Sequence, residues 1–212
     1  MGGTSELIVR SAALTDQGLA QLIDPPPALS IQGHKLTDAG LAHLSRFDRT
    51  ELIALSDLRN VTGTGLGKLN PSLRTLSLAR CPITPEGIAA IGNNNQLKTL
   101  SLLGVMLTPQ HLQQFQNYRC EQLDFNVCGL DDETLRHLPA LETLTRITIQ
   151  NSMVSGKGLA ELKRMKNLKV LTVDGNSRVT KEQVNQLAQE LPSVKLEINV
   201  ASTPEPVPSS ER

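Results

Sequence analysis

Three residues that could bind a metal ion or act as nucleophiles, His34, Cys81 and Cys128, occupy equivalent positions of a repeated stretch of sequence. Neighbours in this set stand two repeats apart. In a stack with about 4.8 Å between layers, each gap is near 10 Å, too wide for a disulfide or for one zinc ion. We therefore expect these side chains to be buried or hydrogen-bonded in their turns, and we predict no metal site and no cofactor. Cys120, at a leucine position of the repeat, is expected to be a core thiol.

Catalytic and phosphate-binding patterns are absent from the sequence. His43 and His137 fall at outward helix positions, and His111 replaces a glycine of the repeat; none has a nucleophile or paired carboxylate at a motif spacing. Neither GxGxxG nor GxxxxGK[ST] occurs. A basic cluster near the seventh turn is interpreted as a solvated convex surface, with binding of an acidic partner or RNA as the alternative. Its members are Lys157, Lys163, Arg164, Lys166 and Lys169. The sequence predicts a protein that is not an enzyme.

The elements that position these residues belong to one repeating unit, seen in full in SLRTLSLARCPITPEGIAAI, residues 72–91. Leu76 and Leu78 alternate with polar residues as in a half-buried strand, Ile83 closes the turn, and Thr84 starts a short helix. Eight copies follow one another at steps of 22 to 25 residues, within the range of leucine-rich repeats. The positions equivalent to Ile83 are Leu14, Leu36, Val61, Ile83, Leu107, Leu130, Val154 and Val179.

Each copy also carries a polar residue suited to start a helix, because such side chains accept hydrogen bonds from unpaired helix N–H groups. These residues are Thr15, Thr37, Thr62, Thr84, Thr108, Asp131, Ser155 and Thr180. Five copies have a glycine in the first helical turn: Gly18, Gly40, Gly65, Gly87 and Gly158. Glycine costs about 1 kcal/mol of helix propensity there, so we infer that it lets the helix lie close to the turn beneath. The turns with His111, Thr134 and Gln183 are expected to be looser.

The stretches LTDAGLAHL (36–44) and LARCPITPEGIAAI (78–91) resemble the cysteine-containing, ribonuclease-inhibitor-like class of leucine-rich repeats, in a bacterial-type variant. The resemblance covers about residues 5–200. It implies an α/β solenoid with a curved parallel sheet inside, short helices outside and about eight repeats. Such arrays occur in F-box substrate receptors, in bacterial effectors and beside bacterial serine/threonine kinase domains. The resemblance therefore implies protein–protein interaction but does not identify a partner.

Composition limits the partners and the compartment. The chain has 21 basic and 21 acidic residues, so we expect no general attraction to nucleic acid or to an anionic membrane. Three cysteines without a disulfide pattern favour a reducing cytoplasm, and no stretch has the apolar run of a signal peptide or a membrane span. We divide the chain into a flexible N-terminus (1–5), a repeat domain (6–200) and a disordered proline- and serine-rich tail (201–212).

The first strand is expected at residues 6–10 without a preceding amphipathic helix, so the N-terminal repeat should present an uncapped sheet edge. Three explanations remain open for this edge. A preceding domain or segment could cover it, the chain could associate through it, or the first repeat could simply fray.

Strand alternation predicts which side chains face the concave side of the sheet, and the directional polar groups gather in its C-terminal half. The candidate partner-binding residues are Gln122, Asp124, Asn126, Arg146, Gln150 and Asp174. Because adjacent strands lie about 4.8 Å apart, these side chains could converge on one polar segment of a protein partner. The alternatives are a merely solvated sheet face or binding elsewhere.

These observations predict a non-catalytic scaffold that binds a protein partner through the concave sheet, mainly its polar C-terminal half. One alternative is a sensory or regulatory repeat segment of a larger, kinase-associated bacterial signalling protein. A structural spacer is the other alternative. The spacer hypothesis predicts that substitutions on the concave face leave every interaction of the protein intact.

Overall fold

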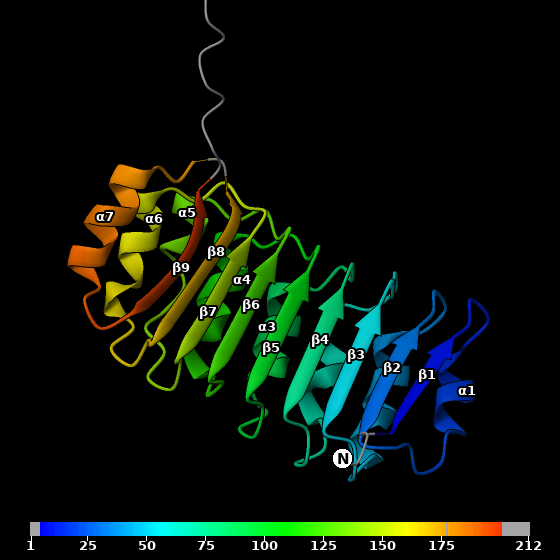
Figure 1. The fold of residues 1–212 in the computed structure, drawn as a ribbon. Helices are drawn as coiled ribbons and strands as arrows, with labels where there is room; N and C mark the ends of the chain where they lie inside the picture. The colour runs from blue at the N-terminus through cyan, green and yellow to red at the C-terminus, as the bar shows by residue number, and fades with distance from the viewer. Residues whose placement is uncertain (1–4, 177, 201–212) are drawn as a thin grey trace, which may run out of the picture.

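Nine parallel strands, paired in the order of the sequence, form one sheet (Figure 1). Short helices cover its convex face, and the concave face is left open. The computed structural model describes residues 5–176 and 178–200. The predicted tail, 201–212, and residues 1–4 of the predicted flexible N-terminus lie outside these described residues. The strands are β1 (Glu6–Arg10), β2 (Ala28–Gln32), β3 (Leu52–Ser56), β4 (Thr75–Ala79), β5 (Thr99–Leu103), β6 (Gln122–Asn126), β7 (Arg146–Gln150), β8 (Val170–Asn176) and β9 (Lys195–Val200).

The register of the sheet aligns equivalent positions of successive repeats. Leu76 pairs with Leu100, Leu100 with Leu123, and Leu123 with Ile147. All four side chains are completely buried. No single repeat can bury these residues alone, so the stack itself forms the core. The predicted α/β leucine-rich-repeat solenoid is confirmed.

Alternation along each strand separates the core from the concave face. In β2 to β7, the second and fourth residues of each strand are buried and the other three are half-buried. Aliphatic side chains fill nearly all of the core positions. Phe115 and Phe125 are the bulkiest fully buried side chains and meet edge to face, with ring centroids 6.0 Å apart.

The helices on the convex face are short. Three α-helices are followed directly by a 3₁₀ helix, and in the third repeat a 3₁₀ helix replaces the α-helix. The α-helices are α1 (Asp16–Ala20), α2 (Asp38–Leu41), α3 (Pro85–Ile91), α4 (Pro109–Gln113), α5 (Asp132–Leu135), α6 (Gly156–Ala160) and α7 (Lys181–Glu190). The 3₁₀ helices are η1 (Ala42–Arg46), η2 (Thr64–Lys68), η3 (Gln114–Asn117) and η4 (Glu161–Arg164). Among the described residues, no helix is long and apolar enough to cross a membrane.

The third repeat differs from the expected pattern. The prediction that Thr62 starts its helix is wrong, because η2 begins two residues later, at Thr64, and is a 3₁₀ helix. Gly63 precedes it with a left-handed backbone (φ +95°). The glycines at 63, 65 and 67 disfavour an α-helix, and the Thr62 hydroxyl bonds to the preceding repeat instead.

Close approach between repeats explains the glycines of the first helical turn. A Cβ atom at Gly87 would overlap the carbonyl oxygen of Thr62, and one at Gly65 would overlap the carbonyl oxygen of Asp38. The inference from the sequence is therefore confirmed at these two positions. His111 replaces this contact with side-chain bonds: Nε2 donates to the Ile83 carbonyl oxygen at 3.0 Å.

Acidic residues at the helix starts tie one repeat to the next. Asp38 accepts hydrogen bonds from the backbone N–H and hydroxyl of Thr62 and from the N–H groups of Gly63 and Gly65, at 2.8–3.1 Å. Asp16 and Asp132 make the same type of bond with the helix-starting residues Thr37 and Ser155 of the following repeats. Each of these acids lies in the first turn of its own helix, where a negative charge suits the positive helix end. In the fold, they also connect adjacent layers.

The two outer strands are less completely packed than the central ones. The inward side chains Leu7 and Val9 of β1 are half-buried, as are Leu196 and Ile198 of β9. In the described residues, each of these strands pairs with a neighbour on one side only. The predicted association through the N-terminal repeat stays a prediction.

Candidate functional site

The six residues of the predicted partner-binding site lie on three adjacent strands of the concave face. Their register places Gln122 beside Arg146, Asn126 beside Gln150, and Gln150 beside Asp174. All six residues are half-buried. Together they define what is called here the C-terminal polar surface: Gln122, Asp124 and Asn126 of β6, Arg146 and Gln150 of β7, and Asp174 of β8.

Hydrogen bonds within the sheet orient much of this surface. The Gln122 amide donates to both carboxylate oxygens of Asp124, at 3.1 and 3.0 Å. The neighbouring Asn151 donates to the Asn126 side-chain oxygen at 2.8 Å. These bonds fix the direction of the acceptor groups while leaving carboxylate lone pairs for a ligand. Within the part of the chain that the structure describes, the Gln150 side chain makes no hydrogen bond and can serve as donor or acceptor.

Glu197 of β9 extends the same surface and was not among the candidate residues. Its carboxylate accepts from Lys195 at 2.7 Å and from the Thr172 hydroxyl at 2.9 Å, and it lies 4.0 Å from the Arg146 guanidinium. The bond from Lys195, followed by that from Thr172, holds the pKa of Glu197 below its ordinary value. The alternation of β9, with residues 195, 197 and 199 on one face, was the signal that could have identified it.

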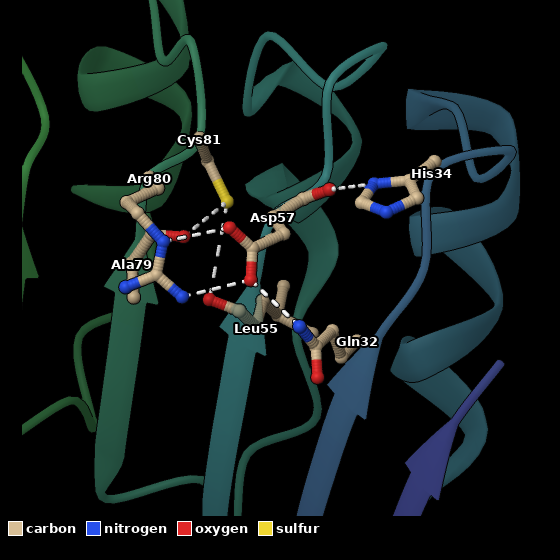
Figure 2. A network of polar contacts seen from close by, with 7 residues as sticks. All are labelled: Gln32, His34, Leu55, Asp57, Ala79, Arg80 and Cys81. Atoms are coloured by element: carbon tan, nitrogen blue, oxygen red, sulfur yellow. Dashed lines mark hydrogen bonds and ion pairs between the residues drawn. The ribbon is translucent and has the colours of Figure 1, made fainter. Parts of the chain in front are cut away.

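A second polar network links the carboxyl ends of β2, β3 and β4 (Figure 2). Asp57 receives both arms of the Arg80 guanidinium, at 2.7 and 2.8 Å, and the Gln32 amide at 2.8 Å. The ring of His34 donates to the Asp57 carbonyl oxygen at 2.9 Å. Arg80, by hydrogen bond and by charge, lowers the pKa of Asp57, although slight burial opposes this. Sequence reasoning missed this network because it depends on a left-handed backbone at both Asp57 and Arg80 (φ +57° and +52°).

Two hollows meet at Arg80. The first, about 390 Å³, lies on the concave face of the N-terminal half, where Arg10, Gln32 and Ser56 contribute to its lining. Small side chains such as Ala54 leave room for it. The second, about 530 Å³, lies on the rim formed by the turns that follow β3, β4 and β5. The concave face of the N-terminal half is therefore hollowed.

The residues that first suggested chemistry have structural roles. The Cys81 and Cys128 thiols are buried and donate to the Ala79 and Leu102 carbonyl oxygens at 3.4 and 3.2 Å, as Figure 2 shows for Cys81. Burial raises the pKa of both thiols and raises that of Cys120 to about 12, so all three are protonated near neutral pH. The prediction of buried or hydrogen-bonded side chains is confirmed. In residues 5–176 and 178–200, no three His, Cys, Asp or Glu side chains cluster as metal ligands would.

The stacked unit of strand, buried turn and short convex helix is the architecture of a leucine-rich-repeat solenoid. The family model described as "Leucine Rich repeat" matches residues 69–92, which contain β4 and α3. The ribonuclease-inhibitor-like subclass stays a prediction. Leucine-rich-repeat domains typically bind proteins, and the fold is usually non-catalytic.

A solved structure shows the same architecture at low sequence identity. A chain of the "Crystal structure of TLR13-ssRNA13 complex" is 15% identical, with a TM-score of 0.53, over 91% of this chain and 32% of that chain. A chain of an octameric complex of Latrophilin 3, Unc5D and FLRT2 is 14% identical, with a TM-score of 0.46, over 74% of this chain and 56% of that one. This chain thus spans about a third of the first structure. No curated protein sequence matches it.

Proposed function

We propose that this protein is a non-catalytic scaffold that binds a protein partner through its concave face, mainly through the C-terminal polar surface. The main support is the placement of hydrogen-bonding side chains in register on three adjacent strands. Helices cover only the opposite face of the described sheet, so the side chains of these strands are accessible (Figure 1).

The charge pattern indicates the kind of partner segment that fits. Asp124 and Arg146 lie on adjacent strands and present opposite charges, and Glu197 adds a carboxylate close to Arg146. A partner segment with both acidic and basic side chains would match this surface. Complementary charges favour specificity and association rate more than raw affinity, and they suit a sheet face without aromatic anchors.

Affinity capture with three forms of the full chain tests this proposal. The concave variant is Asp124→Ala/Arg146→Ala. The matched convex control is Glu133→Ala/Arg136→Ala, which also removes one acidic and one basic residue, from an exposed pair 2.7 Å apart at α5. We expect a protein captured by the wild type and by the convex control to fall at least about tenfold with the concave variant, as when charged contacts are lost from an interface. Equal recovery with all three forms would show that the concave proposal is wrong.

A further inference from the structure

A row of exposed apolar side chains follows the rim of the solenoid, in the turns between the strands and the helices. Met106, Val127 and Met153 expose 68%, 50% and 47% of their surface. They come from the turns after β5, β6 and β7, which are three consecutive repeats. Single exposed apolar residues are common on proteins. Three in successive turns on the same edge form a patch, and such patches indicate interaction surfaces.

Contacts join the turns that carry the row. The Met106 side chain lies across Gly129 of the next turn, so closely that a Cβ atom there would be 2.6 Å from the Met106 methyl carbon. The Met153 N–H donates to the Leu130 carbonyl oxygen at 2.8 Å, which joins the following turn to the same edge. We call Pro82, Met106, Val127 and Met153 the rim row.

Val127 occupies an unfavourable backbone conformation within this row. Its φ is +52°, and the residue directly after the strand is left-handed in neighbouring repeats as well, where Arg80, Gly104 and Asn151 have φ +52°, +63° and +50°. A β-branched residue is a true outlier in this region. The repeat imposes this backbone on each of these turns, so Val127 contributes to the row through its exposed apolar side chain and not through its φ.

A positively charged hollow lies at the N-terminal end of the row. Pro82 and Met106 line the rim hollow of about 530 Å³ together with Arg59 and Arg80. The charge of Arg80 is matched by Asp57 at 2.7 Å. Arg59 is exposed, and within the described residues its guanidinium makes no hydrogen bond or ion pair. The lining of the hollow contains no carboxylate, so its charge is complementary to an acidic group.

We propose that the rim row and this hollow form a second docking surface, which binds a short protein segment carrying an acidic residue followed by apolar residues. The carboxylate would pair with Arg59, and the apolar side chains would lie on Met106, Val127 and Met153. From Pro82 to Met153 is three repeats, or about 14 Å at the strand spacing, which about ten helical residues span. Flexible methionine side chains adapt well to such apolar partners. This surface lies at the strand ends and is separate from the C-terminal polar surface.

A protein segment fits this surface better than a membrane does. Binding to anionic lipid relies on several lysines or arginines around an apolar face. Here one unpaired arginine stands beside the hollow, and the apolar row is a single residue wide in each turn. A narrow row next to one cation matches the width of a peptide.

Selection from a phage-displayed library of random 12-residue peptides on the full chain tests the proposal. We expect enriched peptides with an Asp or Glu followed by apolar residues. Fluorescence anisotropy of a labelled synthetic peptide should give a Kd at least about tenfold higher for Met106→Gln/Met153→Gln, which removes two of the row's apolar side chains from the contact. Arg59→Glu should weaken binding more at low than at high salt, because the effect is electrostatic. Circular dichroism should show that both variants remain folded, since the changed side chains are exposed.

The control separates this surface from the proposed concave site. Asp124→Ala/Arg146→Ala should bind the selected peptide with unchanged Kd, whether or not the concave proposal is correct. No enrichment of peptides, or equal binding by the wild type and the rim variants, would overturn the rim proposal. Binding of phosphatidylserine vesicles that depends on Met106 and Met153 would also overturn it, in favour of a membrane-facing rim.

Discussion

At the scale of single residues, carboxylates that accept several backbone hydrogen bonds hold adjacent repeats together. Asp38 is the clearest case, because four groups of the following repeat donate to it. Partial burial acts to raise its pKa, but the bonds from Thr62, Gly65 and Gly63 outweigh burial, and the pKa is lowered. The ionised form of Asp38 is therefore favoured in the folded state relative to the unfolded chain.

This linkage predicts a loss of stability in acid. Because the folded-state pKa of Asp38 lies below its unfolded value of 3.8, its contribution is complete above that value and disappears as the pH falls through the lower, folded value. We expect Asp38→Asn to lower the free energy of unfolding by about 1–2 kcal/mol at pH 7, since the charged acceptor of four hydrogen bonds is lost. The variant should also lose less stability than the wild type between pH 5 and about pH 3. Urea unfolding at several pH values measures both effects, and parallel pH curves for the two proteins would contradict the assignment.

The sequence identifies residues of this kind only in part. The Asp and Thr at adjacent positions of LTDAGL indicate a helix start. They do not indicate that the carboxylate reaches the next repeat, because that contact depends on the offset between layers. The Asp57–Arg80 pair was missed because it depends on a left-handed backbone at both residues. In contrast, the positions of Asp124 and Arg146 followed from strand alternation, which needs no knowledge of the layer offset.

At the scale of elements, the strands follow the sequence closely and the convex helices less so. Leu76 and Leu78 alternate with polar residues, and this period-two pattern fixes both the strand and its buried face. Between the strands, the local residue preferences decide whether an α-helix or a 3₁₀ turn forms. Segment 63–67 contains three glycines, and the balance shifts from an α-helix to a 3₁₀ turn. Helix type therefore could not be predicted where both forms satisfy the same spacing.

Two glycines at the same helical position provide a matched test of the close packing between elements. Gly87→Ala should lower the free energy of unfolding by about 3 kcal/mol, because its Cβ would overlap the Thr62 carbonyl oxygen and the backbone would have to shift. Gly18→Ala should be neutral or stabilising by up to about 1 kcal/mol, since the nearest atom is a flexible Leu14 methyl group at 3.2 Å. Chemical denaturation of both variants gives the comparison. Similar changes in the two variants would show that the close backbone approach at Gly87 does not set the cost of a Cβ atom there.

At the scale of the whole molecule, each repeat contacts mainly its neighbours, so stability is distributed along one dimension. Core residues of the central repeats, such as Leu100 and Leu123, have a packed layer on both sides and are fully buried. The half-buried Leu7 and Ile198 belong to the outer strands, which pair on one side within the described residues. The same arrangement leaves the concave face and the rim accessible to solvent, because neither surface is needed for the core.

This one-dimensional stacking predicts a gradient of native-state hydrogen exchange. Amides of β1 and β9 should open locally and exchange at least about 100-fold faster than those of β4 to β6, because opening an end breaks one layer contact whereas opening the centre breaks two. Mass spectrometry of exchange under native conditions, repeated at two pH values to establish the exchange regime, measures the difference. Leu100→Ala should then accelerate exchange in β4 to β6, because it leaves a cavity in a fully buried layer. Uniform protection from β1 to β9 would mean that the solenoid opens as a single cooperative unit and that nearest-neighbour packing does not control its stability.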